Sequence, residues 1–85
     1  MKITIRFFAS IREQLDCSDE EISLPESVGN IGQLRLFLIE RGGVWRDALS
    51  YEKPVRMACQ FEMASEETAL SDGCEVAFFP PVTGG

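Results

Sequence analysis

The sequence predicts an α+β domain in which a mixed sheet of four to five strands curls around one main helix. Residues alternate between polar and apolar near both ends of the chain, which indicates strands, and one central segment has apolar residues at helical spacing. The 85 residues, 45% of them hydrophobic, can form one modest core without disulfide or metal support. We therefore expect a single domain over residues 1–79 and an extended, flexible tail over residues 80–85.

The first third of the chain predicts two strands. Residues alternate from Lys2 to Phe8. The set on one face is Ile3, Ile5 and Phe7, and the set on the other is Lys2, Thr4, Arg6 and Phe8. A short helical turn is expected at Ile11–Leu15, and alternation returns over Glu20–Leu24, which ends at Pro25. We expect these two strands to pair as a hairpin with a long connection.

The main helix is predicted to begin after Ser27, a residue that commonly caps helix N-termini. Its apolar residues recur at steps of three and four: Val28, Ile31, Leu34 and Leu38. Gly42-Gly43 supplies a left-handed stop. Gly29 and Gly32 each weaken the first turns by up to ~1 kcal/mol relative to alanine, so the helix start can be displaced.

The second half predicts a short helix or packed connector over Val44–Glu52, and then two more strands. One strand contains Val55, Met57 and Cys59, and the other covers Cys74–Phe79 after an Asp72-Gly73 turn. Pro80-Pro81 ends the last strand because proline has no backbone donor. The fold class, rather than the sequence itself, places the first and last strands side by side in the centre of the sheet.

Charge and cysteine content exclude several classes of function. Fourteen acidic and eight basic residues give a net charge of −6, which argues against nucleic-acid partners and anionic membranes. The three cysteines are too few and too dispersed for a disulfide framework or a zinc knuckle. With an N-terminus unlike a signal peptide and no long apolar run, these features predict a cytoplasmic protein with no membrane attachment.

Side-chain catalysis and cofactor binding have little support in the sequence. The absence of histidine excludes Ser-His and Cys-His nucleophile pairs and imidazole metal ligands, and three cysteines cannot supply an all-cysteine iron-sulfur cluster. The acidic runs Asp19-Glu20-Glu21 and Glu66-Glu67 are either solvated faces, the commoner case, or acid-base or metal groups. We expect no metal site and no bound cofactor.

Two large aromatic residues fall on the polar face of their strands. Phe8 and Phe79 both lie outward by the period-two count, which suggests an apolar patch for a partner protein. Two alternatives would remove this patch: a bulge that breaks the alternation of the strand, or a loop after Ile11 that covers both rings.

The tail Val82-Thr83-Gly84-Gly85 is the strongest functional signal. Glycine has no Cβ, so a Gly-Gly end can enter a narrow channel and present its carboxylate. Pro80-Pro81 favours polyproline II, at about 3.1 Å per residue, and would project the tail semi-rigidly. A carboxylate is a poor electrophile, so chemistry at Gly85 requires a partner that activates it with ATP. A sulfur nucleophile would then give a thiocarboxylate, whereas a lysine would give an isopeptide bond; the remaining alternative is an inert chain end.

Two segments resemble a known family. Residues 72–85, DGCEVAFFPPVTGG, strongly resemble the C-terminus of the molybdopterin synthase small subunits, the MoaD-type sulfur carriers of the ubiquitin-like β-grasp superfamily. Residues 7–13, FFASIRE, are similar to that family's first strand and following turn. Ala58–Phe61 departs from the asparagine-containing turn common in the family, and Met63 stands where the family often has leucine.

The resemblance implies a function as well as a β-grasp fold. Gly85 would be adenylated by an E1-like adenylyltransferase that uses ATP, converted to a thiocarboxylate, and then donate sulfur to cyclic pyranopterin monophosphate in molybdenum cofactor biosynthesis. The partner is a large catalytic subunit, in a heterotetramer of two small and two large subunits, which makes this chain a non-catalytic subunit.

Particular residues are implied as contacts with the partner. Those of the tail that would enter it are Pro80, Pro81, Val82, Thr83 and Gly84, and those of the apolar patch are Phe8, Met63 and Phe79. The alternatives in function are a ubiquitin-like modifier joined to lysines, a sulfur carrier for another pathway such as thiamin, and a plain binding module.

Overall fold

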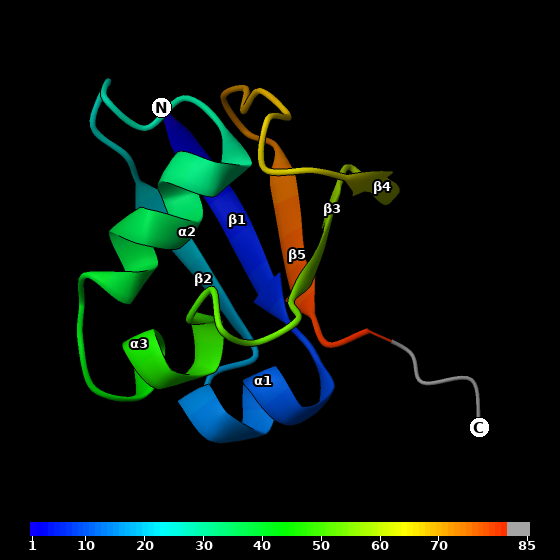
Figure 1. Cartoon of the computed structure of the whole chain (residues 1–85). Coiled ribbons are helices and arrows are strands. Elements are labelled where there is room, and N and C mark those ends of the chain that lie inside the picture. Colours follow the sequence, from blue (N-terminus) through cyan, green and yellow to red (C-terminus); the bar gives the residue numbers. More distant parts are fainter. Residues whose placement is uncertain (82–85) are drawn as a thin grey trace.

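A five-stranded mixed sheet and three helices make up residues 1–81, the part of the chain that the computed structural model describes (Figure 1). The elements in chain order are β1 (Lys2–Phe7), α1 (Ala9–Leu15), β2 (Asp19–Ser23), α2 (Ile31–Ile39), α3 (Val44–Leu49), β3 (Arg56–Cys59), β4 (Glu62–Ala64) and β5 (Glu75–Phe79). The spatial order of the strands is β2-β1-β5-β3-β4. The predicted α+β class is confirmed.

The first and last strands form the centre of the sheet. β1 and β5 run parallel, with Phe7 opposite Phe78, while β2, β3 and β4 join by antiparallel pairing. The Asp72-Gly73 turn sets this register: the Asp72 carboxylate accepts a hydrogen bond from the Lys2 amide at 2.8 Å, and the Gly73 amide donates to the Lys2 carbonyl at 2.7 Å. Gly73 has φ +81°, which favours glycine. The predicted turn and the central parallel pair are both confirmed.

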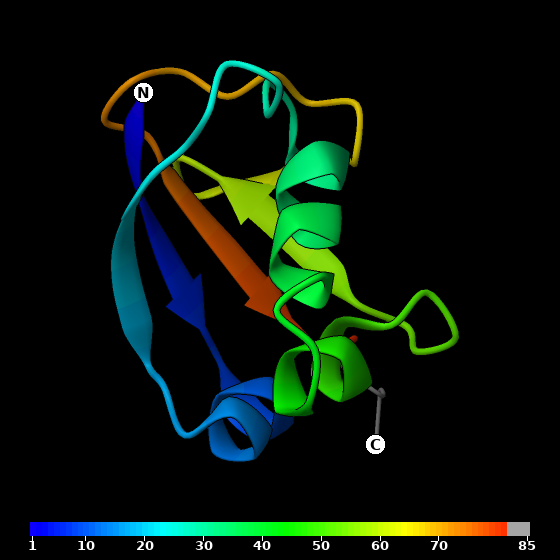
Figure 2. The same cartoon turned by 90° about the vertical axis from the view of Figure 1, so that its left-hand side faces the viewer.

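The core lies between the sheet and α2, which crosses one sheet face (Figure 2). The predicted inward residues of β1 are all buried, as are two alternate residues of β5 and the three apolar residues of α2 that face the sheet. They are Ile3, Ile5, Phe7, Val76, Phe78, Ile31, Leu34 and Leu38. Burying a side chain of this size contributes about 1.5–3 kcal/mol, so this layer supplies most of the driving force for folding.

The start of α2 differs from the prediction. Its N-cap is Asn30, not Ser27, which lies in a turn before the helix. Asn30 accepts a hydrogen bond from the Gln33 amide at 2.8 Å, and the Gln33 side chain accepts from the Asn30 amide at 3.2 Å. This reciprocal capping box satisfies two backbone donors, whereas Ser27 has no partner three residues on that could reach back. Val28 is buried but precedes the helix.

Gly32 has a packing role that its low helix propensity conceals. Its amide donates to the Glu66 carbonyl at 2.8 Å, and a Cβ at this position would lie 3.0 Å from the Glu66 Cβ. The absence of a side chain therefore lets the segment between β4 and β5 lie against the helix. At the other end, α2 stops at Ile39, and Gly42 and Gly43 both have positive φ, as the predicted stop requires.

The remaining boundaries differ by small shifts. The turn expected at Ile11–Leu15 is a helix from Ala9, and Leu24 is buried just beyond β2. Phe8 also lies just outside β1, since it is the N-cap of α1. β4 occupies part of a segment for which the sequence indicated no single element.

Candidate functional site

The root of the tail lies where β5 ends, at Phe79. Pro80 and Pro81 follow and are half-buried against a groove between α1, α3 and the chain before β3. Besides the two prolines, the groove is lined by Ser10, Ile11, Gln14, Ala48, Lys53, Pro54 and Val55. Four of the predicted tail residues, Val82, Thr83, Gly84 and Gly85, lie outside the described residues. The structure therefore describes the body that carries the tail and the point from which the tail departs.

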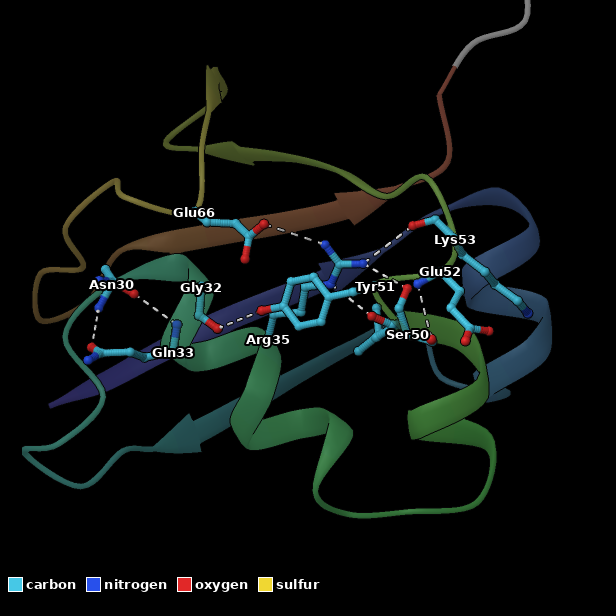
Figure 3. A network of polar contacts seen from close by, with 10 residues as sticks. Asn30, Gly32, Gln33, Arg35, Ser50, Tyr51, Glu52, Lys53 and Glu66 are labelled. Carbon is cyan, nitrogen blue, oxygen red and sulfur yellow. Dashed lines mark hydrogen bonds and ion pairs between the residues drawn. The ribbon is translucent and has the colours of Figure 1, made fainter.

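A buried arginine fixes one wall of this groove. Arg35 of α2 is 3% exposed and donates from Nε to the Leu49 carbonyl at 2.8 Å and from Nη2 to the Ser50 carbonyl at 2.9 Å (Figure 3). Tyr51 stacks over the guanidinium at 4.2 Å, and Nη2 also lies 3.4 Å from the Lys53 carbonyl. These carbonyls follow the last turn of α3, where helical partners are lacking. Arg35 thereby ties α2 to the segment that carries Pro54 and Val55.

The outer sheet face carries the aromatic residues that the sequence singled out. Phe8 is 44% exposed and extended, with φ −128°, and its amide donates to the Phe78 carbonyl at 3.2 Å. Phe79 is half-buried and pairs with Arg56. Phe7 and Phe78, one residue earlier, point into the core. The period-two count is thus confirmed for both rings, and neither is covered by the segment after Ile11.

These two rings border a hollow of about 450 Å³, called here the outer hollow. Its lining residues come from β1, β3 and β5 and from two connections: Arg6, Phe8, Ala58, Phe61, Glu75, Ala77 and Phe79. Ala58 and Ala77 are paired across β3 and β5, and their small side chains leave the space that the aromatic rings surround. Such an apolar concavity on a sheet face is typical of a site for a partner's side chain.

The polar edge of the outer hollow is neutralised by an ion pair. The Arg6 Nε lies 3.2 Å from a Glu75 carboxylate oxygen, and the two side chains are 49% and 22% exposed. Glu75 is also held through its backbone, since its amide donates to the Gln60 side chain at 2.7 Å. The charges in the lining therefore cancel one another.

Met63, the third predicted patch residue, lies beside the outer hollow rather than in its lining. It is 66% exposed and pairs with Ala58, which places it on the same outer face. The structure thus puts all three predicted residues on one face and brings Phe8 and Phe79 together around one concavity.

Phe61 is a lining residue that is not among those predicted from the sequence. It is 87% exposed and occupies the connection between β3 and β4. No clear signal marks it in the sequence, because Gln60 and Phe61 are recognised as a two-residue connection, in which an aromatic residue is unusual, only once β4 is known. Ala58 and Ala77 could not be singled out from the sequence either, because alanine is common in helices, strands and cores alike.

The cysteine thiols do not form a nucleophilic site. Burial raises the pKa of Cys17, with Glu20 nearby contributing in the same direction, and burial raises the pKa of Cys59 as well. Both thiols therefore stay protonated at neutral pH. Residues 1–81 contain no cluster of three or more Cys, Asp or Glu side chains placed to hold a metal ion.

Several residues of the two acidic runs form ion pairs with basic side chains. In the first run, Glu20 is bonded to Arg41 and Glu21 lies 3.7 Å from Lys2. In the second, Glu66 lies 3.9 Å from Arg35. These contacts favour the interpretation of both runs as solvated, partly paired faces. No helix within residues 1–81 has the length and apolar character needed to cross a bilayer.

Comparison with known proteins gives a consistent result. The pattern of the ThiS family matches residues 5–85. The molybdopterin synthase sulfur carrier subunit of Haemophilus influenzae is 34% identical over 83 residues, which cover 98% of this chain and 99% of the relative. The subunit of the same description from Escherichia coli is 35% identical over 83 residues, with the same coverage.

A solved structure shares the fold. It is the complex of subunits 1 and 2 of molybdopterin-converting factor from Helicobacter pylori, which aligns with a TM-score of 0.67, 23% identity and full coverage of both chains. This likeness concerns the fold, and it confirms the β-grasp architecture expected from the sequence.

Proposed function

Because the chain belongs to the ThiS family, and within it to the molybdopterin synthase sulfur carrier subunits, we propose that it carries sulfur on Gly85 for molybdenum cofactor biosynthesis. The observation that carries this proposal is the match through Gly85 to relatives of that description, on a domain whose central strand leads directly into the tail. The body acts as a holder, and the reacting group is the α-carboxylate of the last residue.

The proposed chemistry takes place on partner enzymes. A carboxylate oxygen of Gly85 attacks the α-phosphorus of ATP on an E1-like adenylyltransferase, which forms an acyl adenylate and releases pyrophosphate. A sulfur nucleophile then displaces AMP and leaves a thiocarboxylate. The thiocarboxylate donates its sulfur to cyclic pyranopterin monophosphate on the large catalytic subunit, and two such transfers build the dithiolene. Burial raises the pKa of the Cys17 and Cys59 thiols, which supports a non-catalytic role for this chain.

The outer face is the proposed contact surface for these partners. Phe8 and Phe79 beside the outer hollow, together with Met63, would meet the large subunit and the activating enzyme in turn. Pro80, Pro81 and the tail residues Val82, Thr83 and Gly84 would enter the partner's channel. The nearness of the patch to the tail root supports this arrangement, because Phe79 is both a hollow residue and the last residue of β5. We place the assembly, a heterotetramer by resemblance, in the cytoplasm.

Intact-mass spectrometry of protein isolated from cells tests the proposal. The expected result is a population heavier by the difference between one sulfur and one oxygen, with the change located in the C-terminal peptide. A matched variant extended by one residue beyond Gly85 should lack that population, because its carboxylate lies out of register with ATP. Absence of the sulfur-bearing form in cells that make molybdopterin would contradict the proposal, and a ladder of larger conjugates would favour the modifier alternative.

A further inference from the structure

Phe61 is the most exposed of the large apolar side chains in residues 1–81, at 87%. Met63 follows at 66%, and Phe8, the third residue of the outer face, is 44% exposed. Phe61 is not part of the core cluster, and the aromatic pairs within the described chain, Phe7 with Trp45 and Phe7 with Phe78, do not include it. The fold therefore gains little from this ring.

The backbone at Phe61 is also unfavourable for its side chain. Cys59 pairs with Glu62, so Gln60 and Phe61 form a two-residue hairpin connection, and both have positive φ, +52° and +67°. Type I′ turns have this geometry and favour asparagine and glycine, because a bulky side chain in the left-handed region meets the backbone.

Gln60 makes hydrogen bonds that stabilise this turn, whereas the Phe61 side chain makes no contact within the described residues that explains its position. The Gln60 side chain accepts a hydrogen bond from the Glu75 amide at 2.7 Å, and its own amide donates to the Glu75 carbonyl at 2.9 Å. These two bonds fix the turn against β5. An exposed aromatic residue in a strained backbone position, without compensating contacts inside the chain, indicates an intermolecular role.

The surroundings of Phe61 indicate what it contacts. Its ring lines the outer hollow together with Phe8 and Phe79, so it extends the proposed interface toward the β3–β4 turn. Arg6 and Glu75 already pair with each other at the edge of this space. The lining is thus neutral and mostly aromatic and aliphatic, which fits an apolar side chain rather than a charged one.

We propose that Phe61 is a specificity-determining anchor for the large catalytic subunit: an apolar side chain of that subunit enters the outer hollow and packs between Phe61 and the Phe8–Phe79 pair. This inference rests on the proposed function, which supplies the partner. It concerns a residue of the turn rather than the tail chemistry, so the two can fail separately.

The test is a variant that separates stability from binding. Phe61→Asn places a residue that tolerates positive φ in the turn, so Tm should stay the same or rise by a few degrees. The Kd for the large subunit, measured by calorimetry with the full-length chain, should nevertheless increase about tenfold, as for an anchor in an interface. Phe61→Tyr, which keeps the ring, should bind within about twofold of the wild type. A Kd for Phe61→Asn within that same range would overturn the proposal, as would a fall in its Tm, since the ring would then serve the fold.

Two further variants separate this inference from the proposed function. Leu36→Asn removes another exposed apolar side chain, 47% exposed on α2, and should leave the Kd unchanged. Phe79→Asp should abolish tight binding. If Phe79→Asp fails to bind while Phe61→Asn binds normally, the anchor is wrong and the proposed interface stands. Thiocarboxylate formation by Phe61→Asn should equal that of the wild type. A loss in that step as large as the loss of large-subunit binding would overturn the assignment of Phe61 to the large subunit.

Discussion

Two pairs of consecutive phenylalanines show how the two faces of the sheet differ: the inner face forms the core, and the outer face is the proposed binding surface. Phe7 and Phe78 are 1% and 0% exposed and stack with their ring centroids 6.2 Å apart in the core. Phe8 and Phe79, the residues that follow them in the chain, lie on the opposite face and line the outer hollow. The four residues are chemically identical, so their different environments follow from strand parity alone.

This contrast shows that residue type does not reveal the role of an apolar side chain in a small β-rich domain. On the inner face, Phe7 packs against Trp45 of α3 and against Phe78, and both phenylalanines belong to the core cluster. On the outer face the described chain offers no covering element, and two alanines leave a space. Seven substitutions in four groups test this contrast and the energies of the polar contacts around it.

The largest expected effect is on the inner face. Phe78→Ala should lower the free energy of unfolding by about 3–5 kcal/mol, because it removes a fully buried ring and leaves a cavity. Phe79→Ala, the matched control on the outer face, should cost about 1 kcal/mol or less. Urea denaturation followed by circular dichroism measures both, and equal losses would show that the outer ring belongs to the core.

The second effect concerns binding. Phe79→Asp places a charge in the outer hollow and should weaken the affinity for the large subunit about thirtyfold or more, as expected when an interface anchor is lost. The domain should stay folded. Ser23→Asp adds the same charge to the same face at its far edge, on β2, and should bind normally. Loss of the native circular dichroism spectrum in Phe79→Asp would instead assign this residue to the core.

The third effect compares two arginines. Arg35→Leu leaves the carbonyls of Leu49 and Ser50 without their donor, which should cost about 1–3 kcal/mol because they are shielded from water. Arg6→Leu breaks only a partly exposed ion pair and should cost less than about 1 kcal/mol. Thermal unfolding of both variants measures the two losses of stability. If Arg35→Leu lost as little as Arg6→Leu, Arg35 would not be what ties α2 to the segment beside the tail.

The smallest effect depends on pH. Hydrogen bonds from Arg41 hold the pKa of the Glu20 carboxyl below its ordinary value. A lowered pKa in the folded state stabilises the protein above the unfolded-state pKa, and that stability is lost as the pH falls through the folded-state value.

Because this pair is partly exposed, its contribution should be about 0.5–1 kcal/mol at neutral pH. Glu20→Gln should therefore be less stable than the wild type at neutral pH, and the difference should disappear in acid. Urea midpoints over a pH series measure this, and a difference that does not change with pH would refute the assigned cause.

Much of the fold could be predicted because its signals are local. Ile3, Ile5 and Phe7 alternate with polar residues, the Asp72-Gly73 turn precedes β5, and Gly42-Gly43 ends the helical segment. Each signal depends on neighbours within a few residues. Phe8 and Phe79 could be placed on the outer face by the same count.

Other features depend on contacts between distant segments, which a single sequence does not display. Ser27 and Asn30 are both good N-cap residues, and the choice depended on the reach of Gln33. The burial of Arg35 requires the carbonyls after α3 to meet α2, which only the packed structure brings about. Phe61 was missed because its strained backbone and its place beside the outer hollow appear only once β3, β4 and β5 are paired.

Transfer of labelled sulfur tests the central claim most directly. Protein carrying a radiolabelled thiocarboxylate on Gly85 is mixed with the large subunit and cyclic pyranopterin monophosphate, and the label is followed in a single turnover. Our account predicts that the label leaves the polypeptide and appears in the pterin, and that a chain lacking Gly84-Gly85, taken through the same labelling reaction, delivers no label to the pterin. Sulfurated pterin that forms while the label stays on the protein would contradict it.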